Sequence, residues 1–427
     1  MDSRHQCHRL FPLILGVLLF AAPAFADTIE ALSGNIIEGK VISRDDKFVV
    51  MEVKVGGKAV QRKFGISLIR AITIEGQPRE VLKEGGSTTP GTSTKGPTPG
   101  SPSSPRSAKE IDAIIAQAGK EPPDWLATTA LNLPASLDLT WPEKPDGGWN
   151  NQKNVGQFIW DVINPNASRW REGIKLMHHL IDVNKTDDAL RIRATNTMAG
   201  MYHHFFQDYA RAAYYWRQAG DKADYIGLAE CYFRLGNRTM AMDILNRLQR
   251  LPVSAVKLWA DMGDTNKAIS LVDLWANGNG HDEAMMHAGD ACRLAGRFAQ
   301  ATQFYEKIIA LPDTKDNKRS KDRAKASLDS IKYFDTFDVK KVADGTYKSS
   351  SLGYEGQVEV TVVVASGKIE SVKVTNHKEK QYYASINDTP AQIIAKQSVK
   401  GVDATSRATI TSEAIINATA KALGGGK

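Results

Sequence analysis

The sequence predicts a multidomain fold with a small all-β barrel first, an α-helical repeat region second and an α+β domain at the C-terminus. Three observations predict it. Before residue 83 the chain holds short runs rich in Val and Ile, and between about 108 and 335 apolar residues follow a helical spacing that repeats. After about residue 340 the pattern returns to strand-like alternation.

Residues 1–26 are typical of a secretory signal peptide. Arg4 and Arg9 give a basic start, Leu10 to Phe20 is an apolar run, and Ala24-Phe25-Ala26 is a small-residue cleavage pattern. The apolar run is shorter than the roughly 20 residues that span a bilayer, although an uncleaved anchor stays an alternative. We therefore expect an exported protein, periplasmic or otherwise extracytoplasmic, and membrane-associated if the signal is retained.

The charge of the chain is mild and dispersed. The net charge is +7 over 427 residues, and only Lys315 to Lys325 forms a local basic run, which is typical of a solvated face. No basic stripe with interleaved aromatic residues is present, so we expect no nucleic-acid partner. Apart from Cys7 in the signal, the cysteines are Cys231 and Cys292. They are predicted to be buried free thiols, with a disulfide as the alternative.

Residues 27–83 are predicted to form a small antiparallel β module. Runs at 36–41, 48–55, 59–64 and 69–74 are rich in β-branched residues, and Gly56-Gly57 marks a hairpin turn. Five short strands are expected in this length, four of them at these runs, and together they resemble an SH3-like or Sm-like barrel. Residues 84–107 follow, dominated by Gly, Ser, Thr and Pro, and are predicted to be a flexible linker because they can bury almost no apolar surface.

Residues 108–335 are predicted to form helix–turn–helix repeats. Each repeat has a small or polar residue at the turn, an Ala five residues later and a large apolar residue four after that. Successive turns lie 29, 27 and 33 residues apart, which brackets the tetratricopeptide period. The aligned sets are Gln207, Ala212 and Trp216; Gly236, Ala241 and Leu245; Gly263, Ala268 and Val272; and Gly296, Ala301 and Tyr305.

This stretch resembles shortened tetratricopeptide repeats, whose stacked helices present a concave face to a peptide or protein. We expect it to dock a protein partner. The pairs His178-His179 and His203-His204 raise the question of a metal site. No Cys or carboxylate accompanies them at ligand spacing, so packing is the favoured interpretation and no metal is predicted.

Residues 340–427 are predicted to form the α+β domain. Strands are expected at 358–364 and 369–374, and a helix is expected to start at Thr389-Pro390, with Thr as its cap. A final helix is expected from about Glu413 to Leu423, capped by Ser412. The loop before it is rich in hydroxyl groups, a pattern typical of an ordinary capped loop and also of a phosphate site at a helix N-terminus.

The region from Asp344 to Leu423 resembles the FMN-binding domain of the flavin subunits of Na⁺-pumping quinone reductases and related electron-transport complexes. The resemblance rests on Asp-Gly-Thr-Tyr at 344–347, Gly-Tyr-x-Gly at 353–356, paired strands around Gly367 and His-Lys-Glu at 377–379. Its most specific part is the closing motif, which in the family reads Asp-x-x-Ser/Thr-Gly-Ala-Thr followed by Thr-Ser.

The resemblance implies FMN esterified through its phosphate to Thr409. It also implies cofactor-binding roles for the motif residues Asp403, Ser406, Ala408 and Thr411, and pocket-lining roles for Tyr354 and Glu379. Arg407 stands where the family has Gly. A positive φ there would cost about 1 kcal/mol, and the guanidinium would either obstruct the flavin transferase or pair with the flavin phosphate. Non-covalent FMN and loss of the flavin are therefore the alternatives to covalent attachment.

Together these observations predict an extracytoplasmic flavoprotein that acts as an electron-transfer module, with a protein redox partner docked on the repeats. A membrane-bound electron-transport complex is the partner that the resemblance suggests. No nucleophile–base or paired-carboxylate constellation stands out, which favours a redox carrier over an enzyme with its own substrate site. The alternative is a cell-envelope interaction scaffold whose flavin-type domain is structural or sensory.

Overall fold

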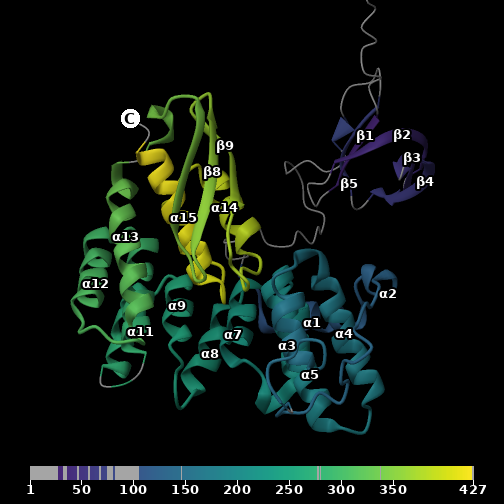
Figure 1. Ribbon diagram of the computed structural model, residues 1–427, viewed down its shortest axis with the longest axis horizontal. Coiled ribbons are helices and arrows are strands. Elements are labelled where there is room, and N and C mark those ends of the chain that lie inside the picture. Colours follow the sequence, from purple (N-terminus) through teal and green to yellow (C-terminus); the bar gives the residue numbers. More distant parts are fainter. Residues whose placement is uncertain are drawn as a thin grey trace, which may run out of the picture. The chain divides into compact units, whose positions relative to one another are not determined.

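The computed structural model divides the chain into two compact units, residues 1–94 and 95–427, and each is described by itself (Figure 1). The predicted signal peptide, the turn at 56–57 and most of the predicted linker lie outside the described residues. The structure describes residues 27–31, 36–45, 48–55, 58–66, 69–74, 80–81, 105–145, 147–276, 278, 280–336 and 338–425.

The first unit is an antiparallel sheet with strand order β4-β3-β2-β1-β5-β6. Alternate residues of β3, namely Val49, Met51 and Val53, are buried and meet Ile29 and Ile72 in a small core. The sequence indicated five strands, and the structure adds a short sixth. Among the described strands β4 pairs with β3 alone, so the SH3-like or Sm-like barrel stays a prediction. The strands are β1 Asp27–Ala31, β2 Ile36–Arg44, β3 Phe48–Val55, β4 Lys58–Gly65, β5 Ile69–Thr73 and β6 Glu80–Val81.

The second unit begins with helices, as predicted for residues 108–335. Their amphipathic faces meet in one continuous core. The α-helices are α1 Ala108–Lys120, α2 Trp125–Thr128, α3 Val155–Phe158, α4 Trp170–Val183, α5 Asp188–Phe206, α6 Tyr209–Ala219, α7 Tyr225–Arg234, α8 Arg238–Arg247, α9 Ser254–Asp261, α10 Thr265–Ser270, α11 His281–Leu294, α12 Phe298–Ala310 and α13 Lys318–Thr336. A π-helix, η2, spans Ile159–Ile163, and short 3-10 turns are η3 Ala167–Arg169, η4 Gly220–Lys222, η5 Val272–Trp275 and η6 Val339–Lys341.

The helices from α5 to α12 form consecutive hairpins at the positions that the repeat predicts. Gly236, Gly263 and Gly296 have φ of 102°, 83° and 73°, and Gln207 has 51°. A left-handed residue ends a helix without steric cost when it is Gly, which explains the small residue at three of these four turns. The four aligned Ala residues are fully buried where the two helices of each hairpin meet. The hairpins are thus present, and their tetratricopeptide identity stays a prediction.

The C-terminal part of the second unit is an antiparallel three-stranded sheet, β7-β8-β9, with two helices packed on one face. Alternate Val residues of β8 are buried against these helices, and the residues between them are more exposed. In Figure 1 the sheet and its helices stand above α7 and α9, and α13 runs beside α15. The bounds are β7 Gly345–Leu352, β8 Gln357–Ala365, β9 Lys368–Asn376, α14 Ser385–Lys396 and α15 Thr409–Gly424.

Both C-terminal helices begin earlier than the sequence indicated. Helix α14 starts at Ser385, so Thr389 and Pro390 lie inside it and the predicted cap at Thr389 is wrong. Helix α15 starts at Thr409, so Ser412 is not its cap. The Ser412 hydroxyl accepts bonds from the Thr389 hydroxyl and the Thr405 backbone N–H instead. These groups bind each other across the two helices and the loop. Thr389 and Ser412 are therefore engaged in tertiary hydrogen bonds, and neither caps a helix.

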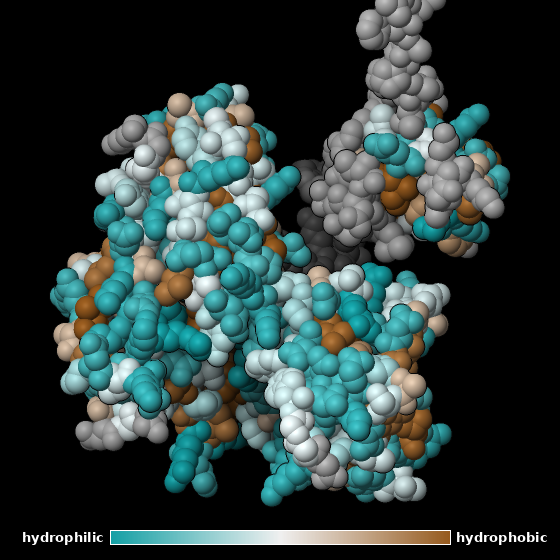
Figure 2. All heavy atoms as spheres, viewed as in Figure 1, coloured by the Kyte–Doolittle hydropathy of each residue, from teal (hydrophilic) through white to brown (hydrophobic). Residues whose placement is uncertain are grey.

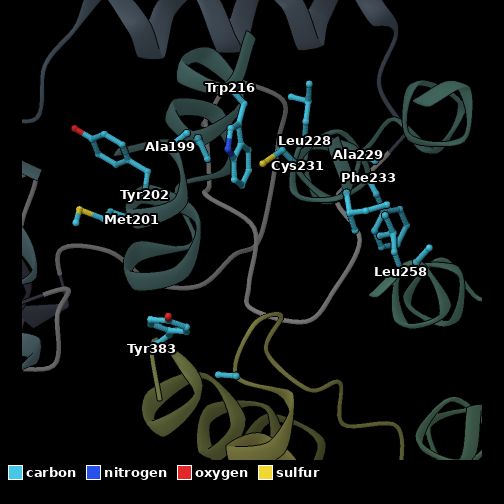
Figure 3. Packing of buried hydrophobic residues seen from close by; sticks show 14 of the residues in the cluster. Ala199, Met201, Tyr202, Trp216, Leu228, Ala229, Cys231, Phe233, Leu258 and Tyr383 are labelled. Atoms are coloured by element: carbon cyan, nitrogen blue, oxygen red, sulfur yellow. The ribbon is translucent and has the colours of Figure 1, made fainter. Parts of the chain in front are cut away.

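The helical region and the C-terminal region share a hydrophobic interface. Tyr382, Tyr383 and Ala408 pack into the core of the helices. In Figure 3 Tyr383 extends from the C-terminal region toward α5, where its ring centroid lies 5.1 Å from that of His204 and 5.8 Å from that of Phe205. The Tyr382 hydroxyl also donates to the Pro165 carbonyl at 3.0 Å. The two regions therefore form one unit, and on the face in Figure 2 its outside is mostly hydrophilic with small, separate hydrophobic groups.

Cys231 and Cys292 are buried free thiols, so the disulfide alternative is wrong in this structure. Burial raises the pKa of both, that of Cys292 to about 11. Across the described part of the chain, no helix combines the length and the hydropathy that crossing a membrane requires.

Candidate functional site

The hydroxyl-rich loop leads directly into the N-terminus of α15. Arg407 has a φ of 65°, which places the residue that replaces the family Gly in the left-handed region. Ala408 is the N-cap residue and offers no side-chain bond to the first turn. By contrast, Asp208, Asp224 and Asn237 cap the starts of α6, α7 and α8 with side-chain oxygens. The first N–H groups of α15 thus lack the capping oxygen that these other helices have.

Thr409 is the first residue of α15 and is half-buried at the wall of a cavity of about 280 Å³. This volume is just below the roughly 300–1,000 Å³ of most small-molecule sites. The C-terminal region contributes residues 406–411, the loop at 354–355 and residues 379–381. The helices contribute the other side of the cavity, where the polar or charged lining residues include His203, Glu230, Lys257, Glu283, His287 and Arg323.

Six of the seven residues that the sequence singled out line this cavity: Tyr354, Glu379, Ser406, Ala408, Thr409 and Thr411. Asp403 does not. It lies in a neighbouring buried space of about 20 Å³, which Thr409 also lines. The structure therefore brings the motif residues together around one hydroxyl group, and Asp403 lies behind it.

Glu379 holds three parts of the site together. Its carboxylate accepts bonds from the backbone N–H groups of Tyr354 and Glu355, at 3.0 and 2.8 Å, and from the Thr411 hydroxyl at 2.6 Å. Because a buried carboxylate needs such partners, it fixes the loop after β7 against the first turn of α15. Glu379 therefore positions the site as well as lining it.

Asp403 pairs with cations of the helices. Its carboxylate lies 2.5 Å from Arg234 Nη2 on α7 and 3.2 Å from Lys257 Nζ on α9. Burial alone would raise the pKa of Asp403, but the charges of Lys257 and Arg234 outweigh burial and hold the pKa below its usual value. Asp403 thus stays ionised and fastens the loop to two helical repeats.

Ser406 and Glu230 make a second link across the same interface. The Ser406 hydroxyl donates to Glu230 at 2.8 Å, and the same carboxylate lies 3.1 Å from His203 Nε2. Burial would raise the pKa of Glu230, but His203 and then Arg234 hold it well below its usual value. Glu230 is therefore an ionised group that joins the loop to α5 and α7. Among the described residues, no group of three or more His, Cys, Asp or Glu side chains is arranged to hold a metal ion.

Arg407 is ion-paired with Asp224, the N-cap residue of α7. The side chain thus reaches across to the helices and also lines the cavity. The two roles that the sequence suggested for this guanidinium, obstruction of a flavin transferase and pairing with the flavin phosphate, stay predictions. The left-handed backbone at Arg407 is the conformation that Gly adopts most easily, which explains the Gly of the family at this position.

Glu413, where the final helix was expected to begin, lies inside α15 and faces the helical region. Its carboxylate lies 2.7 Å from Arg293 Nη2 on α11. Burial raises the pKa of Glu413 to about 7, with Arg293 acting in the opposite direction. Asp403, Ser406, Arg407 and Glu413 thus form successive polar links between one loop and the faces of α7, α9 and α11.

The cavity residues that the helices contribute were not predicted from the sequence. Trp160 and Lys257 carry no motif, and Arg323 belongs to the basic run interpreted as a solvated face. A usable signal was present in α13. Ser320, Arg323, Ser327 and Ser330 recur at helical spacing, and all four are buried. A polar stripe on one helix face indicates a polar neighbour or ligand, here α15 and the cavity.

Comparisons with known proteins agree with this geometry. Residues 353–424 match the FMN-binding domain family. Over 85 residues the chain is 40% identical to an uncharacterized protein of Treponema pallidum (strain Nichols), a match that covers 19% of this chain and 23% of that protein. No solved structure matches the chain. Residues 353–424 therefore form an FMN-binding domain, and in this chain helical repeats complete the cavity around its final helix.

Proposed function

We propose that the protein is an extracytoplasmic flavoprotein that carries FMN on Thr409 and transfers electrons to or from a partner protein. One observation carries the proposal: the FMN-binding domain places the hydroxyl of Thr409 at the wall of a cavity, in the first turn of α15. A helix N-terminus without a side-chain cap suits a phosphate group, because its free N–H groups and its dipole both favour an anion.

The residues of the cavity fit a flavin. Lys257 and Arg323 supply positive charge near Thr409, and Ile226, Leu258 and Ile410 supply apolar surface. Trp160 and Tyr354 both line the cavity and are 40% and 47% exposed. The Arg319 guanidinium lies over one face of the Tyr354 ring, 3.8 Å from its centroid, so the isoalloxazine would stack on Trp160 or on the other face of Tyr354. Because the cavity is small for a whole FMN, we expect the phosphate end inside and the ring system at the opening.

The covalent bond is expected to form by phosphoryl transfer from FAD, the donor that the resemblance implies. The Thr409 oxygen loses its proton and bonds to the phosphorus of the FMN half, while the pyrophosphate bond of FAD breaks and AMP leaves. When bound, the flavin supplies one- and two-electron redox chemistry. The side chains that line the cavity would bind the flavin, orient it and exclude water from it.

The repeats have a second role in this proposal. One face of α7, α9 and α11 is occupied by the chain's own loop, through Arg234, Lys257 and Arg293. A protein redox partner is therefore expected to bind near the opening of the cavity, close to Trp160 and Tyr354, and not on this face. A membrane-bound electron-transport complex remains the class of partner that we propose.

The test uses the full chain, exported from a host that expresses a flavin transferase. A denaturing gel viewed under ultraviolet light should show a fluorescent band for the wild type and for Thr375→Ala, an exposed threonine of β9 outside the cavity, and none for Thr409→Ala. Mass spectrometry should place one FMN phosphoester on the peptide that contains Thr409. A colourless wild-type protein with that peptide unmodified would overturn the proposal and favour the interaction scaffold.

A further inference from the structure

We propose that Arg323, on helix α13 of the helical region, binds the phosphate of the flavin. The inference rests on the proposed function, because it concerns the anion expected next to Thr409. It assigns a binding role to a residue outside residues 353–424, so that the helical region is part of the cofactor site and not only a surface for partners.

Arg323 is a buried cation with unused hydrogen-bonding capacity. The residue is only 7% exposed, yet its Nη2 atom has no hydrogen-bond partner. Its nearest ion-pair partner is Asp290 Oδ2, at 3.9 Å, beyond hydrogen-bond distance. That oxygen also makes no hydrogen bond, whereas the other Asp290 oxygen accepts a bond from the Tyr305 hydroxyl. A buried guanidinium in this state is costly unless an anion satisfies it.

The position of Arg323 identifies where that anion would be. Arg323 lines the same cavity as Thr409 and Ile410, the first two residues of α15. The other cations of this cavity have carboxylate partners: Lys257 contacts Asp261 and Asp403, and Arg407 pairs with Asp224. Lys380 is half-exposed and lies 3.8 Å from Asp161. Arg323 is therefore the buried lining cation best able to accept a ligand.

A phosphate suits the two features that meet here. The uncapped first turn of α15 offers backbone N–H groups, and the planar guanidinium can donate two parallel bonds to phosphate oxygens. A phosphate esterified to Thr409 keeps one negative charge, which would neutralise Arg323. Riboflavin has the same ring system and no phosphate, so Arg323 would not increase its binding affinity.

The experiment measures flavin binding to the full chain produced without a flavin transferase and freed of flavin. The variants are Arg323→Gln and, as a matched control on the same helix, Lys325→Gln, whose side chain is 60% exposed. We expect Arg323→Gln to weaken FMN binding by about tenfold or more, since a charge-assisted bond is lost, and to leave riboflavin binding within about twofold. Lys325→Gln should change neither.

Thermal unfolding separates this role from a structural one. Arg323 lies 3.9 Å from Asp290 without a hydrogen bond, so flavin-free Arg323→Gln should lower the unfolding temperature less than Asp403→Asn, which breaks a hydrogen-bonded buried pair. Sodium phosphate, compared with sodium chloride at equal ionic strength, should raise the unfolding temperature of the wild type more than that of the variant. Equal loss of FMN and riboflavin affinity, or an unfolding temperature lowered as far as in Asp403→Asn, would overturn the inference.

The result also separates this inference from the proposed function. If the wild type binds FMN and Arg323→Gln binds it equally well, the inference on Arg323 is wrong and the flavin proposal stands. If the wild type binds neither flavin and carries none after expression with the transferase, the proposed function itself fails.

Discussion

Arg234 on α7 and Asp403 before α15 form a buried ion pair across the interface of the helical and C-terminal regions, with 2.5 Å between Nη2 and Oδ2. Lys257 and Asp261 extend the pair to α9. Removing one partner from a buried pair leaves an uncompensated charge, which costs far more than the loss of an exposed pair.

We therefore expect Asp403→Asn to lower the free energy of unfolding by about 3 kcal/mol. The exposed pair between Lys318 and Asp322 has the same 2.5 Å separation and provides the control, since Asp322→Asn should cost less than about 1 kcal/mol. Urea unfolding followed by tryptophan fluorescence measures both. Equal effects would show that the interface pair does not hold the two regions together.

The left-handed backbone of Arg407 gives a second prediction. Arg407→Gly and Arg407→Ala both lose the ion pair with Asp224, but only Ala keeps the steric cost of a positive φ. Arg407→Gly should therefore be more stable than Arg407→Ala by about 1 kcal/mol. Unfolding curves of the two variants check this. If Ala proved equal to Gly, the loop would have to adopt another conformation in solution.

Glu413 predicts a pH dependence. Its pKa is raised to about 7 by burial, from 4.5, so the folded protein retains a proton that the unfolded chain has released. The stabilisation is complete below about pH 4.5 and is lost as the pH rises through about 7. The isosteric variant Glu413→Gln cannot titrate and should lack this contribution. Unfolding measured from pH 4 to 8 should show a steeper fall for the wild type, and parallel curves would contradict the prediction.

The two glycines of the Gly-Tyr-x-Gly motif make a matched pair. A Cβ on Gly353 would lie 2.7 Å from Glu379 Oε1 and 2.8 Å from Val358, whereas a Cβ on Gly356 meets nothing within 4 Å. Gly353→Ala should displace Glu379, cost about 1–3 kcal/mol and weaken FMN binding. Gly356→Ala should do neither. Unfolding and flavin titration of the two variants test this, and equal behaviour would remove the steric reason for Gly353.

The repeats could be predicted because their signal is local. A left-handed turn selects Gly, as at Gly236 and Gly263, and close contact of the two helices of a hairpin selects Ala, as at Ala241 and Ala268. The first residues of α14 and α15 could not be predicted in this way. Ser412 has the residue type of a cap, but its hydroxyl serves Thr389 and Thr405. Here the tertiary contacts of Ser412, and not its local preference for a capping position, determine its hydrogen bonds.

The residues of the candidate site also differ in whether they could be predicted from the sequence. Thr409, Glu379 and Tyr354 were found because they lie within one contiguous motif-bearing domain. Lys257 and Arg323 were not, since each lies more than 80 residues before Thr409 in the chain and only folding brings them to the cavity. A single sequence does not show which distant residues come into contact. The exception is a helix such as α13, where polar residues occupy the buried face that is usually apolar.

The enclosure of Thr409 has a consequence for the order of events during biogenesis. Its hydroxyl faces a cavity whose opposite side is made by α7 and α9, through Ile226 and Leu258. If Thr409 carries FMN as proposed, a flavin transferase reaches this oxygen through the opening of the cavity or before these helices pack against the loop. Flavin attachment and the packing of these helices would then compete in time, and a chain whose helices pack first would remain without flavin.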